Sequence, residues 1–162
     1  MNKQLFDHVN IPKQNTNVPD GMAKNIPAHC ADYESWMESV GGIDLQVLGI
    51  GGNGHIGFNE PGSSIASRTR QVKLTPETIR DNARFFAKAA DVPKTAISMG
   101  IGTVLDAAKI VLFANGANKA AAIAAAIEGP VSVKCPASAL QLHPDVTFVI
   151  TKDAAANLTL KF

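Results

Sequence analysis

The chain has 162 residues, of which 46% are hydrophobic, and its formal net charge is +1. A chain of this length suits one domain that buries roughly two thirds of its unfolded surface. The balanced charge lacks the basic patch that nucleic acids require, so no nucleic-acid partner is expected. No apolar stretch reaches membrane-spanning length, and Cys30 and Cys135 are too far apart for a CxxC pair. We therefore expect a cytoplasmic protein with no membrane partner.

Predicted helices and strands alternate along the chain after an irregular, proline-containing segment over residues 1–28. Thr75 and Pro76 are a typical N-cap and first helical residue, so one helix is expected to begin there. Helices are predicted over residues 28–40, 74–86, 103–108, 116–130 and 137–143. Strands are predicted over residues 43–51, 95–102, 109–115 and 144–151.

The predicted strands are continuous apolar runs rather than alternating patterns. Such strands, separated by helices, are typical of an α/β fold with a parallel sheet covered on both faces. Ligands of such sheets bind at the carboxyl ends of the strands. Three loops are expected at that edge, over residues 48–64, 100–103 and 115–119.

The loop over residues 48–64, LGIGGNGHIGFNEPGSS, contains a GxGxxG pattern at Gly49, Gly51 and Gly54. That pattern binds dinucleotides when a helix begins within it, whereas HIGFNEPG follows here and includes a proline. No acidic residue occurs in residues 66–73, near where a ribose partner would lie, so no dinucleotide cofactor is expected. Metal and serine-hydrolase sites are not indicated either, because the histidines lack zinc-like spacing and no GxSxG occurs.

The same loop carries three polar side chains that suit proton transfer: Asn53, His55 and Glu60. Histidine is the side chain best suited to moving protons near neutral pH, and a nearby carboxylate can fix its tautomer. The alternative is an exposed turn that contains an incidental histidine. The residues alone leave both interpretations open.

A phosphate site is indicated by the loop over residues 115–119, NGANK, which lies between a predicted strand and a predicted helix. Backbone N–H groups at a helix N-terminus attract anions, and Lys119 adds a positive charge. Arg84, near the end of the 74–86 helix, offers a second cation with bidentate geometry. The alternatives are a solvated surface lysine and a charge at a helix C-terminus.

Four segments resemble the glucosamine-6-phosphate deaminase family: GNGHIGFNEPGSSIASRTR, LTPETIRDNARFF, VPKTAISMGIGTVLDA and PASALQLHPDVTFVIT. The GHIGFNEP stretch is specific to that family, since the related 6-phosphogluconolactonases do not normally continue as FNEP. The resemblance implies a Rossmann-like three-layer α/β/α sandwich with a mostly parallel sheet, formed as a single domain over residues 1–162. It also implies conversion of glucosamine 6-phosphate and water to fructose 6-phosphate and ammonia, without a metal or organic cofactor.

The resemblance assigns a role to each residue of the pattern. His55 would open the sugar ring, Glu60 would orient His55 and balance its charge, and Asn53 would hold the imidazole by a hydrogen bond. Arg84 and Lys119 would bind the substrate phosphate. Residues 73–93 would form a lid that closes over the substrate.

The opening segment MNKQLFDHVNIP resembles a part of the family's chain that lies well inside it. We therefore expect the N-terminal third of the fold to be absent, together with a phosphate loop and the aspartate that transfers a proton between C1 and C2. An alternative function follows: an incomplete homologue that only binds sugar phosphates or associates with other chains, including copies of itself. A lactone hydrolase of the same fold is a further alternative, which FNEP argues against.

Overall fold

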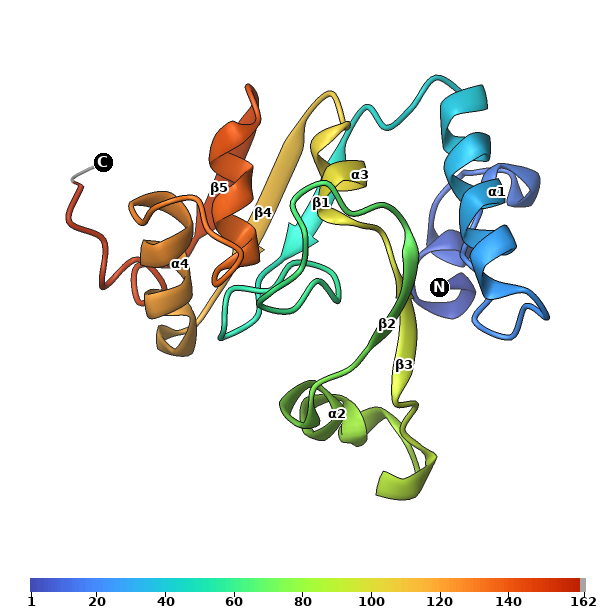
Figure 1. Ribbon diagram of the computed structural model, residues 1–162, viewed down its shortest axis with the longest axis horizontal. Coiled ribbons are helices and arrows are strands. Elements are labelled where there is room, and N and C mark those ends of the chain that lie inside the picture. The colour runs from blue at the N-terminus through green and yellow to red at the C-terminus, as the bar shows by residue number, and fades with distance from the viewer. Residues whose placement is uncertain (161–162) are drawn as a thin grey trace.

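The computed structural model describes residues 1–160, apart from the side chain of Ala89. Its main elements are helices and strands that alternate along the chain except at residues 46–73, where two strands follow each other (Figure 1). The helices are α1 (Ile26–Ser39), α2 (Pro76–Asn82), α3 (Ile101–Leu105) and α4 (Ala120–Ile127). The strands are β1 (Gln46–Gly49), β2 (Arg70–Lys73), β3 (Thr95–Ser98), β4 (Ile110–Ala114) and β5 (Val146–Ile150). Among several short 3₁₀ turns, η4 (Ala83–Phe85), η6 (Ala117–Lys119) and η7 (Pro136–Leu142) matter here.

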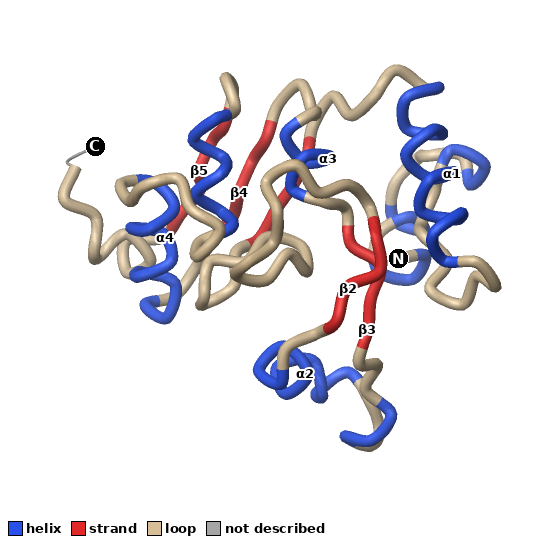
Figure 2. The backbone as a smooth tube through the Cα atoms, viewed as in Figure 1, coloured by secondary structure: helices blue, strands red, loops and turns tan. Residues whose placement is uncertain are grey.

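Three of the strands form a parallel sheet in the order β1-β4-β5. In its register Leu48 lies opposite Leu112, which lies opposite Phe148. The connections between these strands pass through helices, as parallel pairing requires (Figure 2). The predicted α/β class with a mostly parallel sheet is therefore confirmed.

The strands β2 and β3 form a separate antiparallel ribbon, with Val72 opposite Ala96. The expectation that residues 95–102 belong to the parallel sheet was wrong, and no strand was predicted at β2. Each strand of the ribbon is only four residues long, and the side chains of β2 alternate between half-buried and exposed. A short polar strand of this kind is defined by its pairing partner rather than by an apolar run.

The ribbon also removes one of the three loops from the binding edge of the sheet. The turn at Gly100 follows β3 and packs against Ser67, whose hydroxyl accepts a hydrogen bond from the Ile101 N–H at 3.0 Å. A Cβ atom at Gly100 would lie 2.0 Å from the Ser67 carbonyl oxygen. The loops after β1 and β4 remain at the carboxyl edge, as predicted.

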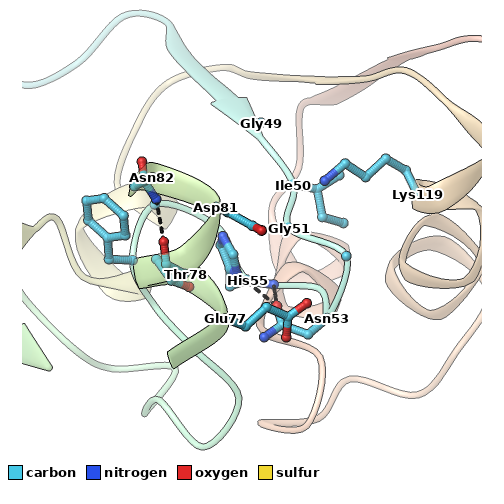
Figure 3. Close-up of a pocket in the computed structure, with 13 residues that line it drawn as sticks. Gly49, Ile50, Gly51, Asn53, His55, Glu77, Thr78, Asp81, Asn82 and Lys119 are labelled. Atoms are coloured by element: carbon cyan, nitrogen blue, oxygen red, sulfur yellow. Dashed lines mark hydrogen bonds between the residues drawn. The ribbon is translucent and has the colours of Figure 1, made fainter. Parts of the chain in front are cut away.

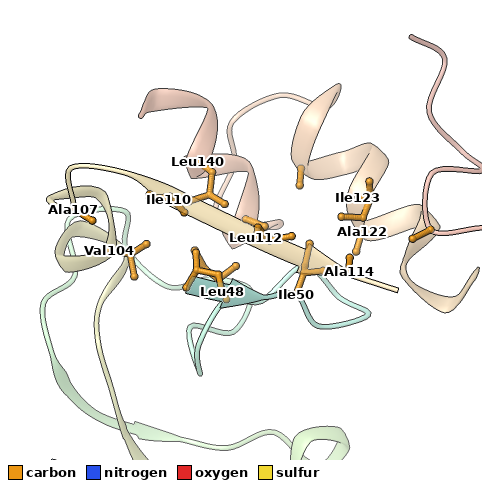
Figure 4. Close-up of a cluster of buried hydrophobic side chains, with 14 residues drawn as sticks. Leu48, Ile50, Val104, Ala107, Ile110, Leu112, Ala114, Ala122, Ile123 and Leu140 are labelled. Carbon is orange, nitrogen blue, oxygen red and sulfur yellow. The ribbon is translucent and has the colours of Figure 1, made fainter. Parts of the chain in front are cut away.

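The main core lies on one face of the parallel sheet. Alternate residues of β4 point into it, and α3, α4 and η7 cover them (Figure 4). This arrangement follows from the wholly apolar sequence of α4 and from the two-residue period of the strands. The fully buried members include Ile56, Ile110, Leu112, Ile123, Ala126 and Ala137.

The opposite face of the sheet carries large apolar side chains that are exposed. Val47, Phe113 and Val149 project from β1, β4 and β5 with exposed fractions of 57%, 49% and 47%. Since Gly49, Phe113 and Val149 share one register row, these side chains lie on one continuous surface. The helical layer described here thus covers one face of the sheet.

Helix boundaries follow their capping residues. The Asn25 side chain accepts a hydrogen bond from the Ala28 N–H at 3.1 Å, so α1 begins two residues before the predicted start. Thr75 caps α2 as predicted, accepting from the Thr78 N–H at 3.2 Å. Within the part of the chain that the structure describes, no helix is long and apolar enough to cross a membrane.

Candidate active site

The loop after β1, helix α2 and Lys119 enclose a cavity of about 350 Å³ at the carboxyl edge of the sheet. Figure 3 shows His55 inside it, with residues of α2 on one side and Lys119 on the other. Two of the three loops predicted at this edge therefore meet in one cavity. The lining residues are Gly49, Ile50, Gly51, Gly52, Asn53, His55, Gly57, Phe58, Glu77, Thr78, Asp81, Asn82 and Lys119.

The glycines of this loop allow it to fold tightly around His55. The Gly51 N–H donates to the His55 carbonyl at 2.9 Å, and the Gly54 N–H donates to the Gly51 carbonyl at 3.0 Å. A Cβ atom at Gly51 would lie 2.2 Å from the His55 ring, so only glycine leaves room for the imidazole. Gly54 has φ +84°, which side chains other than glycine rarely adopt. The glycines at positions 51 and 54 thus allow the loop to close around the histidine ring.

Asn53 joins His55 to Glu60. The Asn53 carbonyl oxygen lies 2.8 Å from His55 Nδ1 and also accepts from the His55 backbone N–H at 3.2 Å. Its amide nitrogen donates to Glu60 Oε2 at 2.8 Å, and this network sets the orientation of the amide. Because Asn53 presents an acceptor to the ring, His55 Nδ1 carries the proton. In the neutral ring, Nε2 is therefore the basic nitrogen.

The carboxylate of Glu60 is half-buried, with Oε2 3.5 Å from His55 Nδ1. Its other oxygen, Oε1, accepts from the hydroxyl of Thr78 at 2.5 Å and lies 3.2 Å from the hydroxyl of Thr75. Burial by itself raises the pKa of Glu60, but the hydrogen bonds from Thr78 and Asn53, the adjacent His55 and the Thr75 hydroxyl outweigh it. The pKa therefore lies below its ordinary value, and Glu60 is a carboxylate at neutral pH.

Asn59 holds the far end of the loop in place. Its side chain is completely buried, and its amide donates to the carbonyls of Ile56 and Met99 at 2.9 and 2.8 Å. Its carbonyl oxygen accepts from Arg70 at 2.8 Å. These bonds join the loop to the end of β3 and the start of β2, so the ribbon positions Glu60, the next residue.

Four pocket residues from α2 were not predicted: Glu77, Thr78, Asp81 and Asn82. The Asn82 amide donates to the Thr78 carbonyl at 2.8 Å across one helical turn. A signal for them was present, since residues three or four apart share a helix face. Sequence could not indicate that this face turns toward His55, because the ribbon sets the position of α2.

The two predicted phosphate ligands are placed differently. Lys119 ends η6 and lines the cavity, as the sequence suggested. Arg84 is exposed and is not among the lining residues; its guanidinium lies 4.9 Å from the centre of the Phe85 ring. The cavity is lined by Asn53, His55 and Lys119, and Glu60 lies directly behind Asn53 and His55. Arg84 lies on η4, outside the cavity.

Within residues 1–160, no group of three or more His, Cys, Asp or Glu side chains is arranged to hold a metal ion. The residues that line the cavity offer three features to a ligand. These are a histidine with one fixed ring nitrogen, carboxylates on the α2 side and an ammonium group on the other. Such a site is suited to moving protons on a small anionic molecule.

Fold and cavity together define an α/β domain with a small-molecule site at the carboxyl edge of a parallel sheet. Residues 1–149 match the family model for glucosamine-6-phosphate isomerases and 6-phosphogluconolactonases. The chain belongs to this family.

Known proteins of the family are similar to the chain to different degrees. Glucosamine-6-phosphate deaminase of Shewanella halifaxensis is 58% identical over 98% of this chain. The solved structure of a monomeric glucosamine-6-phosphate deaminase is 45% identical and superposes over 97% of the chain with a TM-score of 0.93. A 6-phosphogluconolactonase from Thermotoga maritima shares the fold, with a TM-score of 0.66 at 18% identity.

The chain is shorter than these relatives. It spans 60% of the Shewanella halifaxensis protein and 65% of the solved deaminase chain. The recognition of the family from GHIGFNEP is confirmed.

Proposed function

We propose that the cavity performs the chemistry of an amino-sugar phosphate deaminase. Glucosamine 6-phosphate and water would be converted to fructose 6-phosphate and ammonia. The observation that carries the proposal is that His55 and Asn53 line a cavity opposite Lys119, while Asn53 links His55 to Glu60 by hydrogen bonds. The similarity to deaminases, at 58% identity against 18% for the lactonase, supports an amino sugar over a lactone as the substrate.

Ring opening is assigned to His55. Its Nε2 removes the proton from the anomeric hydroxyl, and the same proton passes to the ring oxygen as the bond between C1 and that oxygen breaks. The product of this step is the open-chain aldehyde. Asn53 keeps the proton on Nδ1, and the negative charge of Glu60 stabilises the imidazolium that forms during the transfer.

The substrate phosphate is assigned to Lys119 at one end of the cavity. Arg84 is assigned as a second ligand that reaches the phosphate when residues 73–93 close as a lid. These residues include α2 and η4 at the far end of the β2–β3 ribbon (Figures 1 and 2), a position suited to such a movement. Closure would also exclude water from the reacting sugar.

The remaining chemistry moves a proton from C2 to C1, which reduces the C1 aldehyde to an alcohol and turns the C2 amine into an imine. Water then hydrolyses the imine to the ketone and releases ammonia. A general base for this step typically contributes about 10²–10⁴ in rate. Since the chain spans 60% of the length of the deaminase from Shewanella halifaxensis, a second candidate function is sugar-phosphate binding without turnover.

Release of ammonia and fructose 6-phosphate from glucosamine 6-phosphate tests the proposal, with the 162-residue chain and its His55→Gln variant. We expect the variant to lose about 10²–10⁴ in rate, because the ring-opening base is gone. Activity that His55→Gln leaves unchanged would overturn the assignment.

Calorimetric titration with glucosamine 6-phosphate separates the two candidates. Binding without ammonia release, weakened by Lys119→Ala, would support the second function. Neither binding nor turnover would contradict both.

A further inference from the structure

The carboxylate of Glu60 is held by two different parts of the chain. From its own loop, Asn53 donates to Oε2 at 2.8 Å. From α2, Thr78 donates to Oε1 at 2.5 Å, and the Thr75 hydroxyl lies 3.2 Å from the same oxygen. One oxygen therefore belongs to the histidine loop and the other to the helix.

The contact made by Thr78 is buried, although Thr78 is a polar residue. Its exposed fraction is 4%, and the side chain of Glu60 is 12% exposed. Hydrogen bonds to a buried charged group are stronger than those between neutral groups, and an unpaired buried carboxylate is costly. The hydroxyl groups of Thr75 and Thr78 therefore stabilise the carboxylate of Glu60, in addition to the capping of α2 by Thr75.

Thr75 and Thr78 belong to the first turn of α2, where Thr75 is also the N-cap. Both hydroxyls act on Glu60 in the same direction, since each lowers the pKa of its carboxyl group. If α2 moved away, Oε1 would lose both partners. The carboxylate could then rotate away from its position 3.5 Å from His55 Nδ1.

We propose that Thr78, assisted by Thr75, is the positioning residue for Glu60, so that helix α2 fixes the partner of His55. The carboxylate is oriented toward His55 only while α2 occupies its place over the cavity. Opening of α2 therefore disassembles the proton-transfer group as well as uncovering the cavity. The inference rests on the proposed function for its catalytic meaning, but the contact itself is tested without substrate.

Two substitutions of Thr78 separate positioning from packing. Thr78→Val keeps the shape and removes the hydroxyl, whereas Thr78→Ser keeps the hydroxyl and removes a methyl group. Positioning predicts that Val is the more disruptive variant, and simple packing predicts that Ser is.

The first measurement is amide hydrogen exchange of α2 in the substrate-free protein. Loss of one charge-assisted hydrogen bond should accelerate exchange about ten- to a hundredfold in Thr78→Val. Thr78→Ser should remain close to the unsubstituted protein. The second measurement is the titration of Glu60 by carbon NMR, where Thr78→Val should raise the pKa of the carboxyl group and Thr78→Ser should not.

A double-mutant cycle tests the contact from the other side, and its Glu60→Ala arm alone serves if Thr78→Val folds poorly. Glu60→Ala leaves α2 unchanged in sequence but removes the acceptor. Exchange in α2 should accelerate in Glu60→Ala, and Thr78→Val should add little further effect in that background. Additive effects, or an unchanged Glu60 titration in Thr78→Val, would overturn the proposal.

These outcomes are independent of turnover. A chain that releases no ammonia but shows the non-additive cycle keeps the role of Thr78 and loses the deaminase proposal. A chain that turns over substrate with additive effects keeps the deaminase proposal and loses the role of Thr78.

Discussion

At the scale of single residues, the site depends on which atom of each side chain meets its neighbour. Asn53 uses its carbonyl for His55 and its amide for Glu60, so one neutral side chain sets both partners. A carboxylate at position 53 would supply an acceptor to the ring but no donor to Glu60. The amide of Asn53 therefore links His55 to Glu60 without adding a second negative charge to the site.

We expect Asn53→Asp to raise the pKa of the Glu60 carboxyl. The substitution removes a hydrogen bond that lowers this pKa and places a second negative charge about where the amide stood. The two carboxyl groups should then titrate together, with at least one apparent pKa above the ordinary range. Carbon NMR titration measures this shift, and an unchanged Glu60 titration would contradict it.

Gly51 is a second residue whose identity depends on His55, because the imidazole occupies the space that a side chain would need. We expect Gly51→Ala to lower the free energy of unfolding by about 1–3 kcal/mol, because its methyl group would overlap the imidazole. Gly49→Ala is the matched control, since no atom lies within 4 Å of a Cβ there. Chemical denaturation of both variants measures the difference, and equal losses would argue against the overlap.

At the scale of elements, α1 is joined to the ribbon through one acidic residue. Glu34 accepts from the Thr69 N–H at 2.7 Å, the Thr103 hydroxyl at 2.6 Å and Arg68 at 2.6 Å. Burial by itself raises the pKa of Glu34, but the hydrogen bonds from Thr103, Thr69 and Arg68 outweigh this effect. The pKa of Glu34 therefore lies below its ordinary value. This carboxylate therefore fixes α1 against β2 and α3.

We expect Glu34→Gln to destabilise the fold by about 1–3 kcal/mol at neutral pH, where the carboxylate is charged. A group whose pKa is lowered on folding contributes stability above its unfolded pKa and loses it on acidification. The difference between the two proteins should therefore shrink below about pH 4. Denaturation across pH 3–7 measures it, with Glu38→Gln on the exposed side of α1 as the control. A difference that grows on acidification would contradict this account.

At the scale of the whole molecule, the parallel sheet is covered unequally. Its buried face packs on α3, α4 and η7, while Val47, Phe113 and Val149 are exposed on the other. Contiguous exposed apolar surface of this kind is typical of interaction sites or of a tendency to associate.

We expect the 162-residue chain to associate increasingly as its concentration rises. Phe113→Ser should weaken this association, because it removes the largest apolar side chain from the exposed face. Phe85→Ser is the control, since Phe85 is 68% exposed but lies on η4, far along the chain from the sheet. Sedimentation velocity over a range of concentrations measures both, and equal behaviour of the two variants would rule out the sheet face.

Part of this molecule is determined by local sequence. The capping of α2 by Thr75, the apolar strand β4 and the tight glycine turn around His55 each follow from residues close together in the chain. The hydrogen-bonded residues Asn53, His55 and Glu60 lie within eight consecutive positions, and the sequence pattern singled out all three side chains. Short-range hydrogen bonds and the two- and 3.6-residue periods suffice for such features.

The rest was decided by tertiary structure. The ribbon of β2 and β3 forms because two four-residue segments far apart in the sequence pair with each other, and this pairing satisfies backbone groups along both. The contact of Thr78 with Glu60 spans 18 positions of sequence, and its formation depends on where the ribbon places α2. Sequence by itself determined the family, the strands β1, β4 and β5 of the parallel sheet, and the histidine loop. Only the folded chain decided which helix reaches Glu60, because a long-range contact forms where packing brings the partners together.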